Sequence, residues 1–499
     1  MSEQYPAITL LFPFFSALLI SLFGGWRKKF CLPIVVASLA ISTGAGLAVL
    51  WNVVQQGEII YLLGNWPRPY GIEFRIDSIN ILLVLVILVV ALMAALYSKE
   101  SVERENSDKL PSFYILYLLL VTGLMGMCLT GDAFNLYVLM EVSSLTSYAL
   151  IAMGRKQAPF SSFNYLIMGT IGASFYLIGV GYLFIKTGSL NMVDIQQIIE
   201  ARGLYGSITI MISFIFIMIG VWIKMAFFPL HGWLPNAYYF APSAAGCLIA
   251  PLMTKVGVYV MIRMMFTVFG AQYIIVHLGW TEVVVFMAVI AISAGSILAF
   301  IQANIRRMLT YLIVAEIGYI VGGVWMMNEA GFVGAVYHVV SDAFMTLCLF
   351  LGAAVIGSRL RNLEIRQLSG LYRTMPITMG AITVGGLSMI GIPPTCGFFS
   401  KWYLIRGGIE SGQWVYVGAL LLSSLLIAVL FFRIIETAFF HKIESEHLRV
   451  EKRAVIIDEV PPLMLVPLVL SALIIIAVGL LNQPITLFIG ETAKQFGLN

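Results

Sequence analysis

The chain reads Lys224-Met-Ala-Phe-Phe-Pro229-Leu-His231-Gly-Trp233-Leu-Pro-Asn-Ala at the end of a hydrophobic run that begins near residue 206. A proline within a helix removes one backbone donor and frees the carbonyl four residues earlier. In a bilayer such a carbonyl has to find another partner or line a cavity. The stretch therefore predicts a membrane-spanning helix that breaks within a few residues of a buried lysine.

A second run, 376–404, shares these features, because it contains Gly391-Ile-Pro-Pro394-Thr-Cys-Gly-Phe398-Phe-Ser-Lys401. Both runs carry the pattern Pro-x-x-Gly-aromatic close to a lysine. Broken helices at matching places in two halves of a chain are typical of transporters with inverted repeats. We therefore expect two five-helix repeats, residues 112–268 and 279–438, and the second enters the membrane from the opposite side because five is odd. The alternative is that these prolines only kink helices for packing.

Composition places the whole chain in the membrane. The 499 residues are 60% hydrophobic and 11% charged, with a mean hydropathy of +0.95, whereas soluble domains carry about 25% charged residues. The fold class we expect is an all-α membrane protein in one polytopic domain, residues 1–499, in which the seventh and twelfth helices are broken. By the usual span length of about 20 residues there are about fourteen runs: 7–26, 30–52, 79–98, 112–130, 132–153, 162–186, 206–229, 240–268, 279–302, 308–327, 331–357, 376–404, 413–438 and 461–482.

Basic residues are distributed unevenly between the two sets of loops. Nineteen of the 29 lysines and arginines lie in the odd-numbered loops: Arg27, Lys28, Lys29, Lys99, Arg104, Lys109, Arg155, Lys156, Arg306, Arg307, Arg359, Arg361, Arg366, Arg373, Arg433, Lys442, Arg449, Lys452 and Arg453. Only six lie on the opposite side: Arg68, Arg75, Lys186, Arg202, Arg406 and Lys494. By the positive-inside rule the chain lies in the inner (cytoplasmic) membrane of a cell, and both termini face away from the cytoplasm.

The charged residues inside membrane-spanning runs include a glutamate and three lysines: Glu141, Lys224, Lys255 and Lys401. A charge at mid-membrane costs about 3 kcal/mol on insertion scales, so such residues usually mark an ion or proton path. A lysine amine loses affinity for its proton when it is desolvated and regains it when a carboxylate approaches. We expect Glu141 to pair with Lys224, and the corresponding residue of the second repeat, Glu316, to pair with Lys401. The alternative is that these are static ion pairs that set helix register.

The run 331–357 contains a polar stripe, because His338, Asp342 and Thr346 recur every four residues on one helical face. Histidine is the side chain that titrates nearest neutral pH, so we expect His338 to relay protons, unless it is a packed histidine bonded to a neighbour. His231, at the first helix break, is a second candidate relay or a helix cap. Arg263, late in its span, is expected to extend outward to the interface.

Other chemistry is not indicated. The five cysteines are scattered singly without metal-ligand spacing, and there is no nucleotide-binding glycine loop, haem ligand pair or nucleophile elbow. We therefore predict no cofactor, no metal and no catalytic site, and leave open whether the chain serves an oxidoreductase.

The whole chain resembles the proton-conducting antiporter-like subunits: L, M and N of respiratory complex I, A and D of the multi-subunit sodium/proton antiporters, and relatives in membrane-bound hydrogenases. It is most similar to the D component of those antiporters. The residues that carry the resemblance are Gly64-Asn-Trp-Pro-Arg-Pro-Tyr-Gly-Ile with Asp77, Phe134-Asn-Leu-Tyr-Val-Leu-Met-Glu141, the stretch from Lys224 to Ala237, Ala241-Pro-Ser, Arg306-Arg307-Met-Leu, Gly391-Ile-Pro-Pro and Gly397-Phe-Phe-Ser-Lys401.

The resemblance implies a hydrated row of charges near mid-membrane. Glu141 and Lys224 would face a neighbouring subunit, Lys255 and His338 would be central relays, and Lys401 would be the outlet. The chain departs from the family at four positions. Thr346 stands where family members often carry a lysine, and Asp342 stands where they often carry a histidine. Asn304 stands where an acidic residue is usual, and Glu316 stands where we expect a small or weakly polar residue. Our hypothesis is that Asp342 and Glu316 restore titratable sites that the missing lysine removes.

Three functions remain open from the sequence. The first hypothesis is that the chain is the proton-translocating subunit of a multi-subunit cation/proton antiporter, which exchanges protons for sodium. Its expected partners are other membrane subunits and the lipid bilayer, and no nucleic acid is expected to bind. The second reading is a proton-pumping subunit of a complex I-like quinone oxidoreductase or membrane-bound hydrogenase. The third is a membrane scaffold that conducts nothing.

Overall fold

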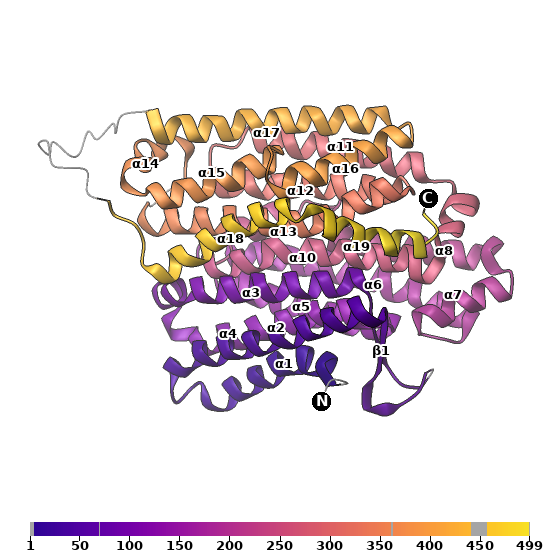
Figure 1. The fold of residues 1–499 in the computed structure, drawn as a ribbon. Coiled ribbons are helices and arrows are strands. Elements are labelled where there is room, and N and C mark those ends of the chain that lie inside the picture. The colour runs from indigo at the N-terminus through magenta and orange to yellow at the C-terminus, as the bar shows by residue number, and fades with distance from the viewer. Residues whose placement is uncertain (1–3, 69, 361–362, 441–456, 499) are drawn as a thin grey trace, which may run out of the picture.

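The computed structural model describes residues 4–68, 70–360, 363–440 and 457–498, and nearly all of them are in helices that lie roughly side by side (Figure 1). The first half contains α1 (Tyr5–Phe23), α2 (Cys31–Gln56), α3 (Ser78–Glu105), α4 (Leu110–Leu129), α5 (Ala133–Ala152), α6 (Ala158–Thr187), α7 (Met192–Ala201), α8 (Ile208–Lys224), α9 (Leu234–Phe240) and α10 (Ser243–Arg263). The second half contains α11 (Thr281–Phe300), α12 (Ile305–Trp325), α13 (Glu329–Arg359), α14 (Leu371–Thr374), α15 (Pro376–Ile390), α16 (Cys396–Glu410), α17 (Trp414–Phe440), α18 (Pro462–Leu480) and α19 (Asn482–Gln495).

The helices are those of a multi-pass membrane protein, which confirms the predicted fold class. Among the described residues, 12 helices have at least 18 residues and are apolar enough to cross a membrane. Two shorter apolar helices, α8 and α15, lie where the broken spans were predicted. Within a bilayer, helices are favoured because each one satisfies its own backbone hydrogen bonds. If the broken pairs α8–α9 and α15–α16 each count as one further crossing, the total is fourteen, and this total stays a prediction.

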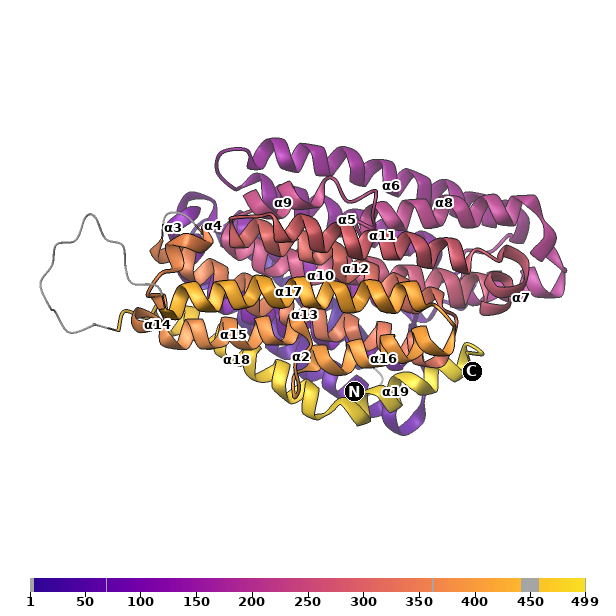
Figure 2. The same ribbon diagram turned by 90° about the horizontal axis from the view of Figure 1, so that it is seen from above.

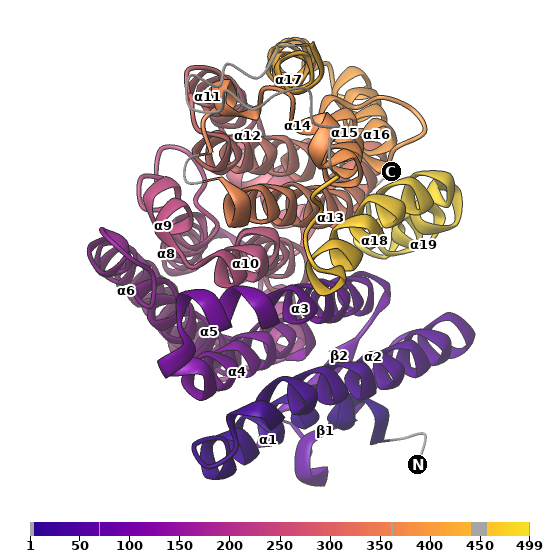
Figure 3. The ribbon, with the colours of Figure 1, turned by 90° about the vertical axis from the view of Figure 1, so that its left-hand side faces the viewer.

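Three helices form the centre of the bundle. The most apolar windows of α10, α12 and α13 are 100%, 94% and 94% buried inside the protein, whereas those of α2, α6 and α17 are 39% buried. Figure 3 shows α10 and α13 in the middle of the bundle, with α1 and α2 at one edge and α11 and α17 at the other. The candidate residues Lys255, Glu316 and His338 belong to the three central helices, so lipid does not contact them.

Both predicted breaks are present. α8 ends at Lys224 and the next helix begins at Leu234, and α15 ends at Ile390 before α16 begins at Cys396. Each break contains a cis prolyl bond, before Pro229 and before Pro394. In Figure 2 the chain passes from α8 on the right to α9 on the left, but from α15 on the left to α16 on the right. The two broken pairs therefore run in opposite directions, as inverted repeats would.

Several elements were not predicted because they are short or polar. Strands β1 (Ile59–Leu62) and β2 (Glu73–Ile76) form an antiparallel hairpin in which Ile59 lies opposite Ile76. The hairpin, α7 and the C-terminal end lie toward the right in Figure 1, and α1 begins at its own right-hand end; we call this side of the bundle the terminal side. Five of the basic residues used for the topology prediction lie outside the described residues, as does most of the polar stretch 440–460: Arg361, Lys442, Arg449, Lys452 and Arg453.

Candidate functional site

The first candidate pair joins α5 to the end of α8. Nζ of Lys224 lies 3.1 Å from Oε1 of Glu141 and donates a 2.8 Å hydrogen bond to Oγ of Ser144. Glu141 and Ser144 face the same side of α5 because they are three residues apart. Lys224 is 6% exposed and the Glu141 side chain 23% exposed, so the carboxylate lies at the edge of the protein. The predicted pairing of these two residues is confirmed, and their role in transport stays a prediction.

The second pair lies between α10 and α13. Nζ of Lys255 is 2.8 Å from Oδ2 of Asp342, and both side chains are fully buried. Thr346, one turn farther along α13, donates a 2.7 Å hydrogen bond to Oδ1 of Asp342 and lies 3.5 Å from the lysine nitrogen. Breaking one partner of such a pair leaves an uncompensated buried charge. The aspartate therefore supplies the counter-charge of Lys255.

The third contact joins α12 to α13 and corrects one prediction. Glu316 was expected to pair with Lys401, but its Oε2 contacts Nε2 of His338 instead. The other ring nitrogen of His338 lies 2.8 Å from Oγ of Ser400. The histidine and Asp342 are four residues apart on one face of α13, and at successive turns of that face the first contacts α12 and the second contacts α10. The predicted polar stripe of α13 is thereby confirmed, with its members bound to different helices.

Lys401 follows Ser400 in α16 and is 4% exposed. Its Nζ donates hydrogen bonds to the carbonyl of Met389, at 2.7 Å, and to Oγ of Ser424, at 3.0 Å. Met389 lies in the last turn of α15, where carbonyls have no partner in their own helix. The ammonium also lies 5.0 Å from the centre of the Tyr319 ring. The broken helix thus supplies a polar site for a lysine without a direct carboxylate partner among the described residues.

The contacts form a row with one interruption. Ser400 and Lys401 are adjacent in sequence, Ser400 contacts His338, and one turn of α13 separates His338 from the Asp342–Lys255 pair. No hydrogen bond or ion pair within the described part of the chain joins Lys224 to Lys255. The row is therefore divided between the peripheral pair of α5 and α8 and the central groups.

His231 lies outside this row. Its ring stacks on Phe228 with 5.0 Å between ring centres, and its buried Nδ1 has no hydrogen-bond partner among the described residues. The side chain does not cap α9, whose start has no side-chain cap. Of the two predicted roles, the cap is therefore wrong, and the relay stays a prediction.

Sequence reasoning missed a further buried ion pair. Arg263, expected to extend outward, instead pairs through Nη2 with Oδ2 of Asp77, which precedes α3. The two residues are 186 positions apart, so no local pattern indicates the contact. The contacts of Ser400 and Ser424 with the row were not predicted either, because serine is common in membrane helices as a packing residue.

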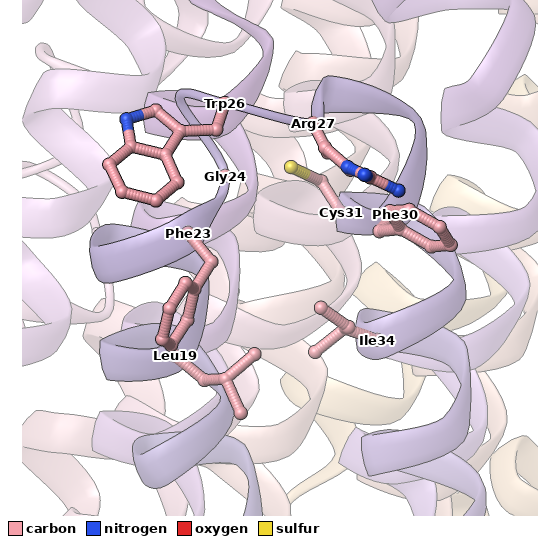
Figure 4. A pocket seen from close by; sticks show the side chains of 8 residues that line it. All are labelled: Leu19, Phe23, Gly24, Trp26, Arg27, Phe30, Cys31 and Ile34. Atoms are coloured by element: carbon pink, nitrogen blue, oxygen red, sulfur yellow. The ribbon is translucent and has the colours of Figure 1, made fainter.

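Two other kinds of site can be assessed directly. In the described ranges, no group of three histidine, cysteine or acidic residues is arranged to hold a metal ion. A cavity of about 290 Å³ between α1 and α2 is lined mainly by apolar side chains, with Arg27 at its rim and Cys31 in its wall (Figure 4). No residue of the row lines this cavity. This cavity is therefore separate from the row.

Comparisons with known proteins agree with this arrangement. The family described as "NADH:quinone oxidoreductase/Mrp antiporter, TM" matches residues 130–427. The chain is 39% identical to the N component of the NADH-quinone oxidoreductase of Desulforudis audaxviator (strain MP104C), over 97% of each chain. It is 30% identical to the D component of the Na(+)/H(+) antiporter of Bacillus subtilis (strain 168), over 88% of this chain and 87% of that one.

A solved structure shows the same fold. One chain of the membrane-bound sulfane sulfur reductase, described as an archaeal respiratory membrane complex, superposes with a TM-score of 0.88 at 27% identity. The superposition covers 99% of this chain and 98% of that one. The resemblance predicted from the motifs is confirmed along nearly the whole length. The chain belongs to the NADH:quinone oxidoreductase/Mrp antiporter family of membrane proteins.

Proposed function

We propose that the chain is the proton-translocating subunit of a multi-subunit cation/proton antiporter. The observation that carries the proposal is the row of buried acid–base contacts: Lys255 with Asp342, and Glu316 with His338, in helices that lipid does not touch. Buried ion pairs contribute little net stability, and ionisable groups inside membranes usually mark proton paths. Lysine, histidine and carboxylates all exchange protons, which arginine does not.

The proposed cycle begins at the Glu141–Lys224 pair. A change of charge in a neighbouring subunit alters how firmly Glu141 holds the lysine. At an effective dielectric constant of 20, two unit charges 4 Å apart interact by about 4 kcal/mol, so opening one pair changes proton affinity at the next. Water has to bridge the interval from Lys224 to Lys255. Protons then pass by Asp342, His338 and Glu316 to Lys401, while Thr346 keeps Asp342 oriented.

A membrane partner is supported by the outward face of α5. Phe134, Val138 and Leu145 are 43%, 42% and 55% exposed, and Glu141 lies among them on the same face. A partly exposed carboxylate facing lipid is unfavourable. A neighbouring subunit that covers this face would remove that cost and would place its own charges next to Glu141. We define these four residues as the α5 face.

The proposed topology has inverted repeats, residues 112–268 and 279–438, and both termini outside the cytoplasm. Two observations support it: the broken pairs α8–α9 and α15–α16 run in opposite directions, and both chain ends lie on the terminal side. Among the described basic loops, the one between α1 and α2, which contains Arg27, Lys28 and Lys29, lies at the other side, as the positive-inside rule requires for the cytoplasm.

The redox-driven pump remains the second candidate. It is favoured by the 39% identity to a protein named as a quinone oxidoreductase component, which exceeds the 30% identity to a protein named as an antiporter component. In that case partner proteins would handle the electrons, and the same row would conduct the protons.

One experiment separates the candidates. The complex that contains this chain is purified in mild detergent, its subunits are identified, and it is reconstituted into liposomes with a pH-sensitive dye inside. The antiporter predicts that a sodium gradient alone drives proton flux. Flux that requires an electron donor and acceptor would favour the redox pump, and no flux under either condition would favour the scaffold.

A further inference from the structure

A second polar path leaves the central row along α10. We propose that Tyr259, Arg263 and Asp77 form a branch that connects Lys255 to water on the terminal side of the bundle, with Asp77 as the last proton-binding group. The inference rests on the proposed function, because it assumes that Lys255 carries protons. It adds an outlet that does not pass through Glu316, His338 or Lys401.

The geometry of α10 supports such a branch. Lys255, Tyr259 and Arg263 recur every four residues, so they lie on one face and cover about 12 Å along the helix axis. All three are buried, with exposed fractions of 0%, 3% and 7%. Nε of Arg263 donates a 2.7 Å hydrogen bond to the Tyr259 hydroxyl, which itself donates a 2.7 Å bond to the carbonyl of Cys128. A line of polar groups therefore begins one turn beyond Lys255 and ends at the ion pair.

The two carboxylate oxygens of Asp77 have separate partners. Oδ1 caps α3 by accepting hydrogen bonds from the backbone nitrogens of Ile79, at 3.0 Å, and Asn80, at 3.2 Å. Oδ2 pairs with Arg263. A proton arriving on Oδ2 would weaken the ion pair but leave the helix cap in place. Asp77 can thus change its protonation state without loss of the local fold.

Water has access to this carboxylate. A cavity of about 220 Å³ is lined by Asp77, Arg263, Glu58, Arg75, Gln196 and Thr267, together with residues of the C-terminal helix and of α7. A water molecule occupies about 30 Å³ of liquid, so several fit. The hydroxyl of Thr267 is buried and has no hydrogen-bond partner among the described residues, which independently indicates that water binds here.

The backbone changes at the same place. α10 ends at Arg263 and continues as a π-helix, Met264–Phe269, which carries Thr267. π-helical turns are rare and are frequent at functional sites. The change of helix type brings a threonine hydroxyl to the cavity one turn beyond the arginine.

The proposed transfer is a proton movement without any redox step. The proton leaves the ammonium of Lys255, passes over water and the Tyr259 hydroxyl, and binds Oδ2 of Asp77 while Arg263 moves aside. It is then released to water in the cavity, and the carboxylate pairs again with the guanidinium. The alternative is that Asp77 and Arg263 only brace α3 against α10.

The test uses the complete complex in liposomes. We expect Asp77→Asn and Tyr259→Phe each to remove the share of the proton flux that leaves by the branch, so that flux falls measurably below the wild type while the outlet through Lys401 remains. Combined with Lys401→Gln, each should lower flux by roughly tenfold or more, the scale for loss of a proton-transfer group. The matched control is Asp132→Asn, because Asp132 also caps a helix, α5, by accepting from Asn135 at 2.6 Å, and forms no ion pair within the described residues. The control should keep wild-type flux.

A double variant separates a path from a brace. Asp77→Asn combined with Arg263→Gln removes both charges and leaves two amides that can bond to each other. A brace predicts that the double variant regains wild-type flux, whereas the branch predicts that flux stays low. If Asp77→Asn prevents assembly, Tyr259→Phe decides, since it leaves the cap and the ion pair untouched; unchanged flux in that variant overturns the branch.

Access of water is measured separately. In a Cys31→Ser background, Thr267→Cys should react with a membrane-impermeant thiol reagent added on the terminal side, and no reaction would overturn the open cavity.

The flux measurements also distinguish the branch from the proposed function. Wild-type flux in Asp77→Asn, in Tyr259→Phe and in the double variant, together with loss of transport in Lys224→Ala, would refute the branch and leave the proposed function standing. Full transport in Lys224→Ala would refute the proposed function itself.

Discussion

Asp342 lies 2.8 Å from the ammonium of Lys255, and neither side chain reaches solvent or lipid. Thr346, one turn farther along α13, donates a 2.7 Å hydrogen bond to Oδ1 of the same aspartate. The carboxylate thus offsets the charge of Lys255 within the bundle centre.

The Asp342–Lys255 pair should show strong coupling in stability. Asp342→Asn alone leaves a buried ammonium without a counter-charge and should destabilise the protein by about 3–5 kcal/mol. Lys255→Gln alone should have a comparable effect. The double variant should lose much less stability than the sum, as judged by thermal unfolding in detergent. Additive losses would show that the two residues do not interact.

Glu316 should be needed for transport. Glu316→Gln removes the carboxylate that contacts His338, so the row is interrupted between Asp342 and Lys401. We expect proton flux in liposomes to fall clearly below the wild type and, when Glu316→Gln is combined with Asp77→Asn, by roughly tenfold or more. Glu410→Gln is the control, because that side chain is 43% exposed and pairs only with Arg406 of its own helix among the described residues. Flux equal to the wild type would end the hypothesis that Glu316 is a titratable site.

Lys401 should have to release its proton during transport, and a fixed positive charge at this position should not replace it. Lys401→Arg keeps the positive charge and can still donate to the Met389 carbonyl and Ser424, but a guanidinium does not release its proton. We expect an assembled complex with thermal stability near the wild type and with little flux through Lys401. A wild-type flux in this variant would show that Lys401 acts only as a fixed charge. Lys401→Gln serves as the neutral comparison.

The α5 face should bind a partner. Leu145→Trp enlarges an exposed apolar residue on that face and should reduce recovery of the other membrane subunits during purification. Leu422→Trp is the matched control, because Leu422 is 56% exposed on α17 at the opposite edge of the bundle. Equal recovery for both variants would place the partner elsewhere.

The sequence predicted the helices better than the contacts between them. Hydrophobic runs are a local property, so the predicted span 331–357 coincides closely with α13. The Glu141–Lys224 pair was also predictable, since both residues lie in recognisable motifs. The partner of Glu316 was not, because the analogy between repeats indicates Lys401, whereas in the structure Glu316 of α12 contacts His338 of α13.

Contacts between distant segments were the least predictable. An arginine near the end of a span usually extends to the interface, and nothing near Arg263 in the sequence indicates otherwise. Its partner Asp77 lies 186 residues away and is brought close only by the packing of α3 against α10. The β hairpin and α7 were missed for another reason: they are too short to give a hydrophobic signal.

The most direct test of the account is proton flux in Lys224→Ala. The variant removes the partner of Glu141 at the start of the proposed row, and Lys186→Ala is its control because Lys186 is exposed at the end of α6. Both variants are reconstituted as complete complexes whose subunit content is checked. Loss of flux in Lys224→Ala with normal flux in Lys186→Ala is the predicted result, and an assembled Lys224→Ala complex with wild-type flux would contradict the account.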